Sequence, residues 1–507
     1  MSNSDQCRSI VACLAFLASV AAAPAIAQPA AGVAAAQGST IAELQRQIDE
    51  LKAMVAELKA AQQVAAQSGR TAAAPAAAPA RASPQLAAQA APPAASPAPA
   101  AAPVAAPVAV AAASPAIVLT PPRRRGTPWY EKLTLRGYTQ MRLNEIVSGD
   151  ATAPAGVSRL RSVGDSGIND RNNFSFRRVR LILQGDLNEH VSLYLQPDFA
   201  TAVSNQSVGE RREGFGQLRD AYVDVFPMED HSLRVRLGQS KVPFGWENLQ
   251  SSSSRLALDR TDAINSAVPG ERDLGIVLYY TPARVQQIWN RLAADGQKLF
   301  GNYGAFGAAL YNGQGTNRSE TNNDLMTVVM ATWPFALDGI GLGRQVLEVG
   351  GAVMRNRVQP ELRSGGIGQV SYADNRVGLH AILYPQPIGL QAEWNWGTGP
   401  EFDPLTQTIQ EKPLSGGYIQ AMARVKRSPL GPFMPFARWQ HYRGGWKAGL
   451  NAPRLETDEL ELGIEFQPIT PLELTFTYGH ARRREADERR SGQAEGDIVR
   501  VQAQWNY

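Results

Sequence analysis

From residue 127 to the last residue, polar and apolar side chains alternate with a period of two. In LTLRGYTQMRLN (133–144), leucines and a methionine fall on one face, and arginines, a tyrosine and a glutamine fall on the other. RVRLILQGDL (178–187), HSLRVRLG (231–238) and PLELTFTYG (471–479) repeat this pattern. Because successive side chains of a strand point to opposite faces, each segment is predicted to be a strand with one apolar and one polar face.

Sixteen such segments are predicted to be strands, and they lie near 132–146, 173–187, 190–201, 215–227, 231–244, 272–281, 301–312, 323–334, 345–357, 370–384, 387–397, 414–427, 432–443, 456–467, 471–483 and 496–507. Connections after odd-numbered strands are long and polar, as in 147–172, 202–214, 245–271 and 398–413, whereas the others are mostly tight. Short turns on one rim and long loops on the other are typical of an outer-membrane barrel. The segment 282–300 breaks this rhythm, and we expect a short helix there at the periplasmic rim.

A soluble β-sandwich is the alternative interpretation of such alternation, but this number of strands exceeds what one sandwich normally holds. We therefore predict an all-β fold, a transmembrane antiparallel β-barrel of about 16 strands whose outer face contacts outer-membrane lipid. Aromatic residues near the strand ends are expected to form its interfacial girdles. These residues are Tyr138, Tyr194, Trp246, Tyr279, Tyr280, Trp333, Tyr384, Trp394, Trp396, Trp439, Trp505 and Tyr507.

The last predicted strand ends in VRVQAQWNY, with Val499, Val501, Ala503 and Trp505 on one face and Arg500 among the polar residues of the other. It is expected to pair with the first strand, because an unpaired edge in hydrocarbon is too costly. A terminal aromatic residue after such alternation also resembles the signal read by the barrel-insertion machinery.

Ahead of the barrel, residues 1–27 are predicted to be a secretory signal peptide with an apolar run over 10–23 and a small-residue cleavage site. Both cysteines, Cys7 and Cys13, lie within it, so the mature chain is expected to have no disulfide and no cysteine nucleophile or metal ligand. The sequence IVAC loosely resembles a lipoprotein cleavage box, but almost no apolar segment precedes Cys13.

Residues 39–67 are predicted to form a short helix in which Ile, Leu and Val recur at spacings of three and four. This spacing is that of a coiled coil, and Ile or Val at one seam position with Leu at the other mildly favours a dimer. An amphipathic helix docked on its own barrel is the alternative. Residues 70–126 are rich in Ala and Pro and are predicted to be a semi-extended linker before the barrel (127–507).

The charge balance says little about partners. Residues 127–507 contain 41 basic and 41 acidic side chains, so the net charge of +4 belongs to the preceding segments. The five histidines lie in unrelated segments, and no nucleophile motif or metal-binding spacing accompanies them. We therefore expect no catalytic residue, no metal or other cofactor, and no nucleic-acid partner.

Two segments carry a family resemblance: GQSKVPFGWENLQSSSS (238–254) and PGERDLGIVL (269–278). Together with FRRVRLILQGDL, LRDAYVDV and LYNGQGTNRSETNND in the same order, they resemble the phosphate-selective porin O and P family. The resemblance covers essentially 130–507. It implies a sixteen-stranded homotrimeric channel in the outer membrane of a Gram-negative bacterium, and some members carry a short coiled coil ahead of the barrel.

The resemblance also implies that the 245–271 connection folds into the lumen as a constriction, although an external loop is the alternative. Its candidate constriction residues are Ser251, Ser252, Arg255, Asp259, Arg260 and Asp262. Lumenal arginines of the family pass anions between successive sites, and the alternation here supplies Arg136, Arg142, Arg178, Arg180, Arg234, Arg236, Arg376, Arg424, Arg438 and Arg500 as candidates. An arginine fork stays ionised and binds phosphate through two points.

The competing hypothesis is that these arginines pair with lumenal acids. Acidic candidates on the same faces are Asp186, Asp198, Asp220, Asp224, Glu348, Glu393, Glu459, Glu461, Glu465 and Glu473. The 245–271 connection also contains no lysine, whereas the family's anion trap uses lysines near the mouth. We therefore expect passive diffusion of small hydrophilic solutes, leaning towards anions such as phosphate. A chiefly structural role, in which the N-terminal helix tethers the barrel to peptidoglycan, is the alternative.

Overall fold

The computed structural model describes residues 128–507 apart from 152, 161–162, 166, 171–172, 201–215, 302, 339–343 and 430. The predicted signal peptide, coiled-coil helix and linker lie outside the described residues. None of the described helices is long and apolar enough to cross a membrane.

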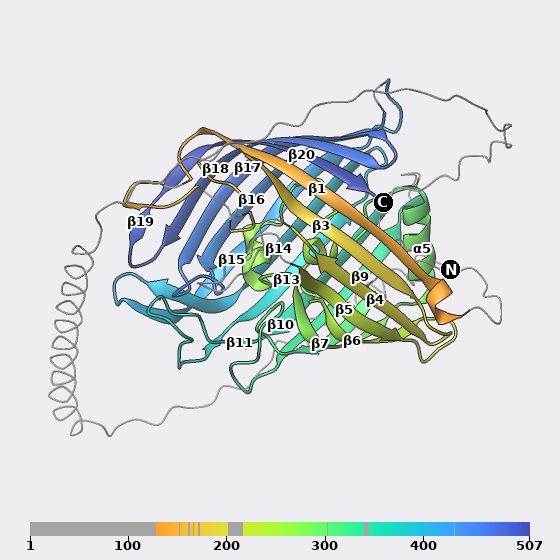
Figure 1. Cartoon of the computed structure of the whole chain (residues 1–507), viewed down its shortest axis with the longest axis horizontal. Coiled ribbons are helices and arrows are strands. Elements are labelled where there is room, and N and C mark those ends of the chain that lie inside the picture. Colours follow the sequence, from red (N-terminus) through yellow and green to blue (C-terminus); the bar gives the residue numbers. More distant parts are fainter. Residues whose placement is uncertain are drawn as a thin grey trace, which may run out of the picture. The chain divides into compact units, whose positions relative to one another are not determined.

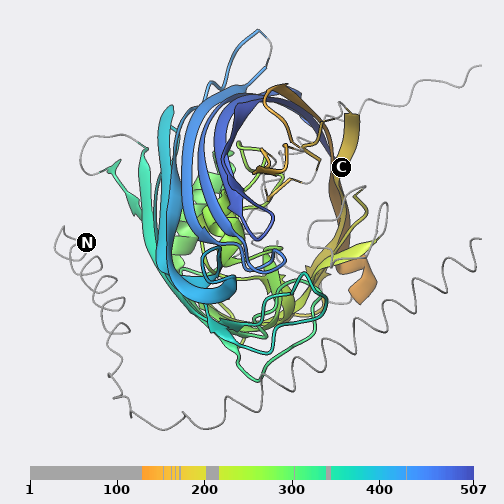
Figure 2. The ribbon, with the colours of Figure 1, turned by 90° about the vertical axis from the view of Figure 1, so that its left-hand side faces the viewer.

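Sixteen antiparallel strands form one closed barrel (Figures 1 and 2). They are β1 Leu133–Ser148, β3 Asn173–Asp186, β4 Val191–Asp198, β5 Gln217–Val225, β6 Leu233–Lys241, β7 Arg272–Tyr280, β8 Phe306–Tyr311, β9 Met326–Ala336, β10 Val346–Arg355, β13 Asn375–Leu383, β14 Ile388–Asp403, β15 Thr408–Ala423, β16 Phe433–Gly445, β17 Arg454–Ile469, β18 Leu472–Ala486 and β20 Ala494–Asn506. Two small sheets pair β2 Gly156–Val157 with β19 Arg490–Gly492, and β11 Arg357–Val358 with β12 Tyr372–Ala373. The helices are η1 Trp129–Lys132, α3 Trp246–Leu249, α4 Asp262–Ala267 and α5 Ala283–Ala294.

Each of the sixteen predicted segments overlaps one barrel strand, so the predicted strand count is confirmed. The prediction of a long loop over 398–413 is wrong. There β14 and β15 continue as a paired hairpin up to Asp403 and Thr408, leaving a turn at 404–407. In this part of β14 four consecutive residues, Gly399 to Phe402, are buried, so the backbone ladder continues without the alternation that marks a half-buried strand.

The barrel closes between β1 and β20, as predicted from the alternation. The pairing runs from Tyr138 opposite Asn506 to Ser148 opposite Asp497. Tyr507 extends the ladder, because its N–H donates to the Gly137 carbonyl at 3.0 Å and its own carbonyl accepts from the Gly137 N–H at 2.6 Å. No edge of the barrel sheet is left unpaired.

In most strands apolar and polar residues divide between the two faces as the alternation predicts, whereas β7 to β10 also turn apolar residues inward. In β17, Leu460 and Leu462 face outward and are each 49% exposed, whereas Glu459 and Glu461 face inward and are 8% and 1% exposed. Inward side chains are this buried because segments inside the barrel pack on them. The green segments between β6 and β8 lie within the ring of strands (Figure 2).

Part of the predicted aromatic girdle is misassigned. Tyr280, Trp396, Trp439, Trp505 and Tyr507 are exposed on the outside. In contrast, four of the other aromatic residues are buried in the interior: Tyr138, Trp246, Tyr279 and Tyr384. Nearness to a strand end gives the height of a side chain along the barrel axis, whereas the parity of its position in the strand decides which face it occupies.

The helix expected in 282–300 is present as α5, and it lies between β7 and β8. Its buried face consists of Val285, Ile288, Trp289 and Leu292. This face packs inward, since the Trp289 indole N–H reaches a carboxylate of the lumenal face of β10, Glu348, at 3.0 Å.

Candidate functional site

The 245–271 connection lies inside the barrel, and Asp259 ties it to one wall. The Asp259 carboxylate pairs with Arg142 of β1 at 2.7 Å, Arg500 of β20 at 2.8 Å and Arg177 of β3 at 3.1 Å. Burial of the carboxyl acts to raise its pKa, but these arginines prevail and hold the pKa of Asp259 well below its usual value. The carboxylate therefore stays ionised and holds three strands to one point of the loop.

Asp262 ties the same loop to the wall formed by β16 to β18. Its carboxylate pairs with Arg483 at 2.5 Å and accepts from the Thr457 hydroxyl at 2.7 Å. Its backbone N–H donates to the Gln440 side chain at 3.0 Å. Contacts on two walls show that the loop crosses the lumen.

The serines of the connection meet β1 and β3. The Ser252 hydroxyl lies 2.7 Å from the Tyr138 hydroxyl and accepts from Arg180 at 2.9 Å. The Gln140 amide donates to the Ser252 carbonyl at 3.0 Å. Ser251 bonds within the run, with its hydroxyl 2.9 Å from that of Ser253.

Glu271 gathers the cations at the end of the connection. Arg255 pairs with it at 2.9 Å, Arg260 at 3.4 Å and Arg219 at 3.8 Å, and Arg272 also contacts it. Burial opposes ionisation, yet the surrounding cations keep the pKa of Glu271 well below its usual value. Four arginines thus share the single negative charge of Glu271, so positive charge exceeds negative charge around it.

An open cleft lies between the loop and the β3–β5 wall. Six arginines and three carboxylates line it: Arg177, Arg178, Arg180, Arg219, Arg255, Arg260, Asp198, Asp259 and Glu271. Arg178 is buried and donates to the Gln140 side chain at 2.7 Å. Among the described residues no carboxylate forms an ion pair with Arg178, so its charge is the least compensated in the cleft.

Six of the ten candidate arginines pair closely with acids. Arg142 and Arg500 bind Asp259, Arg180 binds Asp198 at 2.7 Å, Arg236 binds Asp224 at 2.8 Å, Arg376 binds Asp374 at 2.7 Å and Arg438 binds Glu461 at 2.9 Å. The competing hypothesis of acid pairing therefore describes most of this set.

The other candidates differ in position. Arg136 donates to Gln184 at 3.0 Å, and Arg234 lies 3.6 Å from Asp224. Arg424 directly follows β15, which ends at Ala423, and its backbone N–H extends the ladder to the Pro387 carbonyl. Its side chain donates to the carbonyl of Asp295, just after α5, at 2.6 Å.

The acidic candidates Glu348 and Glu393 do not pair with arginines of the described residues. Glu393 accepts from the backbone N–H groups of Trp246 at 2.9 Å and Glu247 at 3.0 Å, where the inner loop begins. Glu348 accepts from two indole N–H groups. These two carboxylates hold segments of the interior in place.

Two cleft residues, Arg177 and Arg219, escape prediction by strict alternation. The register of β1 on β3 shifts so that Gln140 faces Arg178 and Met141 faces Phe176, which leaves Arg177 in a bulge. A second bulge lies in β5: Gln196 of β4 faces Asp220 and the next residue, Pro197, faces Leu218, which leaves Arg219 without a partner in the register. A bulge inserts one residue into the alternation and re-aims its side chain, and here it adds an arginine to the lumen twice. The pair of adjacent arginines in FRR (176–178), which interrupts the alternation, is the only sequence signal of the first bulge.

A second contact reaches across the lumen from the segment that follows α5. Lys298, after α5, pairs with Glu465 of β17 at 2.7 Å and Glu473 of β18 at 3.4 Å. Burial acts to lower the pKa of Lys298, but both carboxylates together raise it above its usual value. The Gln250 side chain of the inner loop donates to the Lys298 carbonyl at 3.2 Å. The two interior segments therefore touch each other.

Within the described ranges, no three His, Cys, Asp or Glu side chains are grouped so that they could hold a metal ion.

Residues 153–507 match the family model for phosphate-selective porin O and P. No curated protein matches the chain. Among solved structures, the outer membrane channel DcaP of Acinetobacter baumannii is 13% identical, with 74% of this chain and 97% of that chain covered and a TM-score of 0.47. The anion-selective porin from Comamonas acidovorans is 13% identical, with 74% and 99% covered and a TM-score of 0.45. OprB of Pseudomonas putida is 10% identical, with 75% and 95% covered and a TM-score of 0.44.

Proposed function

This chain belongs to the phosphate-selective porin O and P family, and we propose that its channel favours small anions, inorganic phosphate among them. Residence in the outer membrane of a Gram-negative bacterium and passive passage of solutes through the barrel follow from the family. The preference for anions is the proposal, and it concerns the arginine-lined cleft.

The excess of arginines over carboxylates in the cleft, with Arg178 least compensated, carries this proposal. A charged lining sets the sign of the ions that a pore admits. Arginine remains ionised throughout the physiological range and offers a planar pair of donors that suits phosphate. An anion entering the cleft would therefore exchange water for guanidinium contacts supplied from two sides, by the β3–β5 wall and by the inner loop.

We further propose that the inner loop narrows this path. Arg255, Asp259 and Arg260 of the loop line the cleft, and Ser252 accepts from the cleft residue Arg180. Ser251 and Asp262 help to fix the course of the loop. Because loop and wall arginines line the same cleft, solutes in that cleft would pass between them.

Strict phosphate selectivity is not part of the proposal. Lys241 lies at the approach to the loop, and its ammonium donates to the carbonyls of Asn248 at 2.9 Å and Gln250 at 2.7 Å. It also lies 3.9 Å from the Glu271 carboxylate, so its charge is already partnered within the loop. We expect a channel with a moderate lean towards anions.

The test is the reversal potential of the purified protein in a planar bilayer under a KCl gradient, repeated with potassium phosphate. We expect a potential of the sign given by anion preference, and an Arg178→Ala variant whose anion-to-cation permeability ratio falls roughly twofold or more. Arg482→Ala is the matched control, because Arg482 lies on the outer wall with its side chain 57% exposed. Cation preference in the unmodified protein, with no block by phosphate, would refute the proposal.

A further inference from the structure

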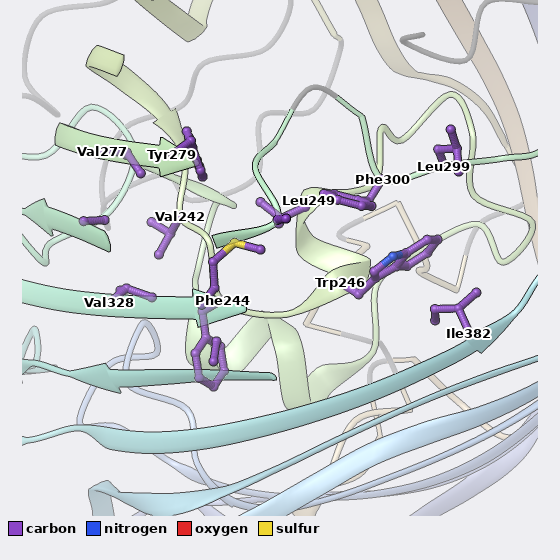
Figure 3. Packing of buried hydrophobic residues seen from close by; sticks show 14 of the residues in the cluster. Val242, Phe244, Trp246, Leu249, Val277, Tyr279, Leu299, Phe300, Val328 and Ile382 are labelled. Atoms are coloured by element: carbon purple, nitrogen blue, oxygen red, sulfur yellow. The ribbon is translucent and has the colours of Figure 1, made fainter. Parts of the chain in front are cut away.

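An apolar cluster lies inside the barrel beside β7 to β10 and β13. The start of the inner loop and the buried face of α5 pack there on the inward faces of β7 to β10 and β13 (Figure 3). The cluster includes Val242, Phe244, Trp246, Leu249, Val277, Tyr279, Trp289, Phe300, Val328 and Ile382. The cleft described above lies along β3 to β5, which β6 separates from the wall of this cluster.

A single carboxylate, Glu348 of β10, lies within this cluster and is 0% exposed. One of its oxygens accepts from the Trp246 indole N–H at 3.2 Å and the Thr332 hydroxyl at 2.8 Å. The other accepts from the Trp289 indole N–H at 3.0 Å and the Tyr384 hydroxyl at 2.8 Å. No lysine or arginine of the described residues pairs with it.

The burial of such a group needs an explanation. A carboxylate removed from water and left without a cation is costly, and charge-assisted hydrogen bonds are what offset that cost. Packing alone does not require a charged group here, since an apolar side chain of similar size would fill the space. The bonds of Glu348 are selective: two go to barrel-wall residues, one to the inner loop through Trp246 and one to α5 through Trp289.

The two bonded segments enter the lumen from opposite rims. The inner loop joins the ends of β6 and β7 that carry the long connections, whereas α5 joins β7 and β8 at the other rim. Glu348 is a point at which one side chain bonds to both. The Gln250–Lys298 contact joins the segments a second time, and Lys298 carries the connection across to β17 and β18.

We propose that Glu348 is a positioning residue: it latches the inner loop and α5 against the β7–β10 wall and thereby sets the open cross-section of the pore. This inference rests on the proposed function, since it assumes that solutes pass on the arginine side of the loop. Glu348 holds the inner loop and α5 against the wall, so the cleft on the arginine side of the loop keeps a fixed width. Removing Glu348 would allow both segments to move. The consequence is a wider and less steady channel.

The test compares Glu348→Ala and Glu348→Gln with the unmodified full-length protein. Gln is the graded variant, because its amide oxygen still accepts but its amide nitrogen cannot accept from an indole N–H. We expect single-channel conductance in KCl to rise about twofold in the Ala variant and less in the Gln variant, with added flicker, because conductance follows open cross-section. Liposome swelling with an uncharged oligosaccharide should rise in the same order. Asp458→Asn is the matched control, since Asp458 is an outward carboxylate that bonds His441.

Two further variants keep the test decisive if Glu348→Ala does not assemble. Trp289→Phe removes only the bond to α5, and Trp246→Phe removes only the indole bond to the loop. Each should raise conductance, and combining either with Glu348→Gln should add less than the sum of the separate effects, because both act through the same contact.

A purely structural role for Glu348 predicts a different result: less heat-resistant barrels with unchanged conductance and swelling in the molecules that do fold. That outcome, or full additivity of the variants, would refute the proposal that Glu348 holds both segments.

The sign of the reversal potential should stay the same in every variant. If the unmodified protein lacks anion preference, the proposed selectivity fails, while conductance and swelling still decide the latch.

Discussion

At the scale of single residues, the interior is organised by carboxylates that each collect several partners. Asp259 and Asp262 join the inner loop to two walls, and Glu271 gathers the arginines at its end. Glu348 and Glu393 look like arginine partners in the sequence, but they bind indole and backbone N–H groups. Residue type and parity predict which side chains face inward. They do not predict which of many inward partners a carboxylate meets, because that depends on where the loop crosses the lumen.

The docking of the inner loop at Asp259 is expected to resist acid. The charged groups around this carboxylate are Arg142, Arg177, Arg178 and Arg500 together with the acidic Asp165, and the net effect keeps its pKa well below the usual value. A depressed pKa contributes stability that is present above the unfolded pKa and is lost only as pH falls through the lower folded pKa. Protection of the inner loop from added protease should therefore be nearly the same at pH of about 7 and about 5. Loss of that protection at pH of about 5 would contradict this prediction.

At the scale of elements, the strands are the part that local sequence predicts best. Each strand is marked by its own alternation, and the seam between β1 and β20 follows from the need to close the sheet. The bulges at Arg177 and Arg219 are not marked in this way, because a bulge arises from the register between two strands. The extended β14–β15 hairpin is missed for a related reason, since Gly399 to Phe402 are buried in succession and so show no alternation.

The seam yields a stability prediction. A Cβ atom placed on Gly137 would lie 2.3 Å from the Arg180 carbonyl oxygen and 2.6 Å from the Tyr507 ring, so the ring covers the glycine closely. Gly137→Val should cost about 1–3 kcal/mol through overpacking. The folded barrel should then lose its compact electrophoretic mobility at a lower temperature. Gly365→Val is the matched control, because a Cβ atom at Gly365 meets nothing within 4 Å, although its φ of 102° adds local strain in an exposed loop. Equal melting of the Gly137 variant and the unmodified protein would contradict the close packing.

At the scale of the whole molecule, the barrel domain is formally neutral, yet its charges are unevenly distributed. Arginines gather beside β3 to β5 and acids on β17 and β18, with the apolar cluster between β7 and β10. Neutral composition therefore coexists with a cleft of positive excess. We also propose that the barrel is a homotrimer and that residues 39–67 form a coiled coil able to reach peptidoglycan, as the family resemblance and the seam of that helix suggest.

Deleting residues 28–126 separates the channel from the proposed tether. We expect the truncated protein to keep its conductance and trimeric state, because the barrel contacts should decide assembly. Envelope integrity, followed by detergent sensitivity of cells that rely on this protein, should fall if the helix tethers the membrane. Unchanged detergent sensitivity would refute the tethering role of the helix. Loss of trimers would show that the helix directs assembly.

The sequence by itself determined the class of fold, the approximate place of every barrel strand, the face that each strand turns to lipid and the family. Those properties are local, because alternation is a property of consecutive residues and closure is demanded by the absence of water in hydrocarbon. Only the tertiary structure decided which arginines are neutralised, which are added by bulges, and that a single buried carboxylate bonds both interior segments. These depend on contacts between residues about a hundred positions apart, such as Trp246 and Glu348, whose meeting is set by how two inserts share one lumen.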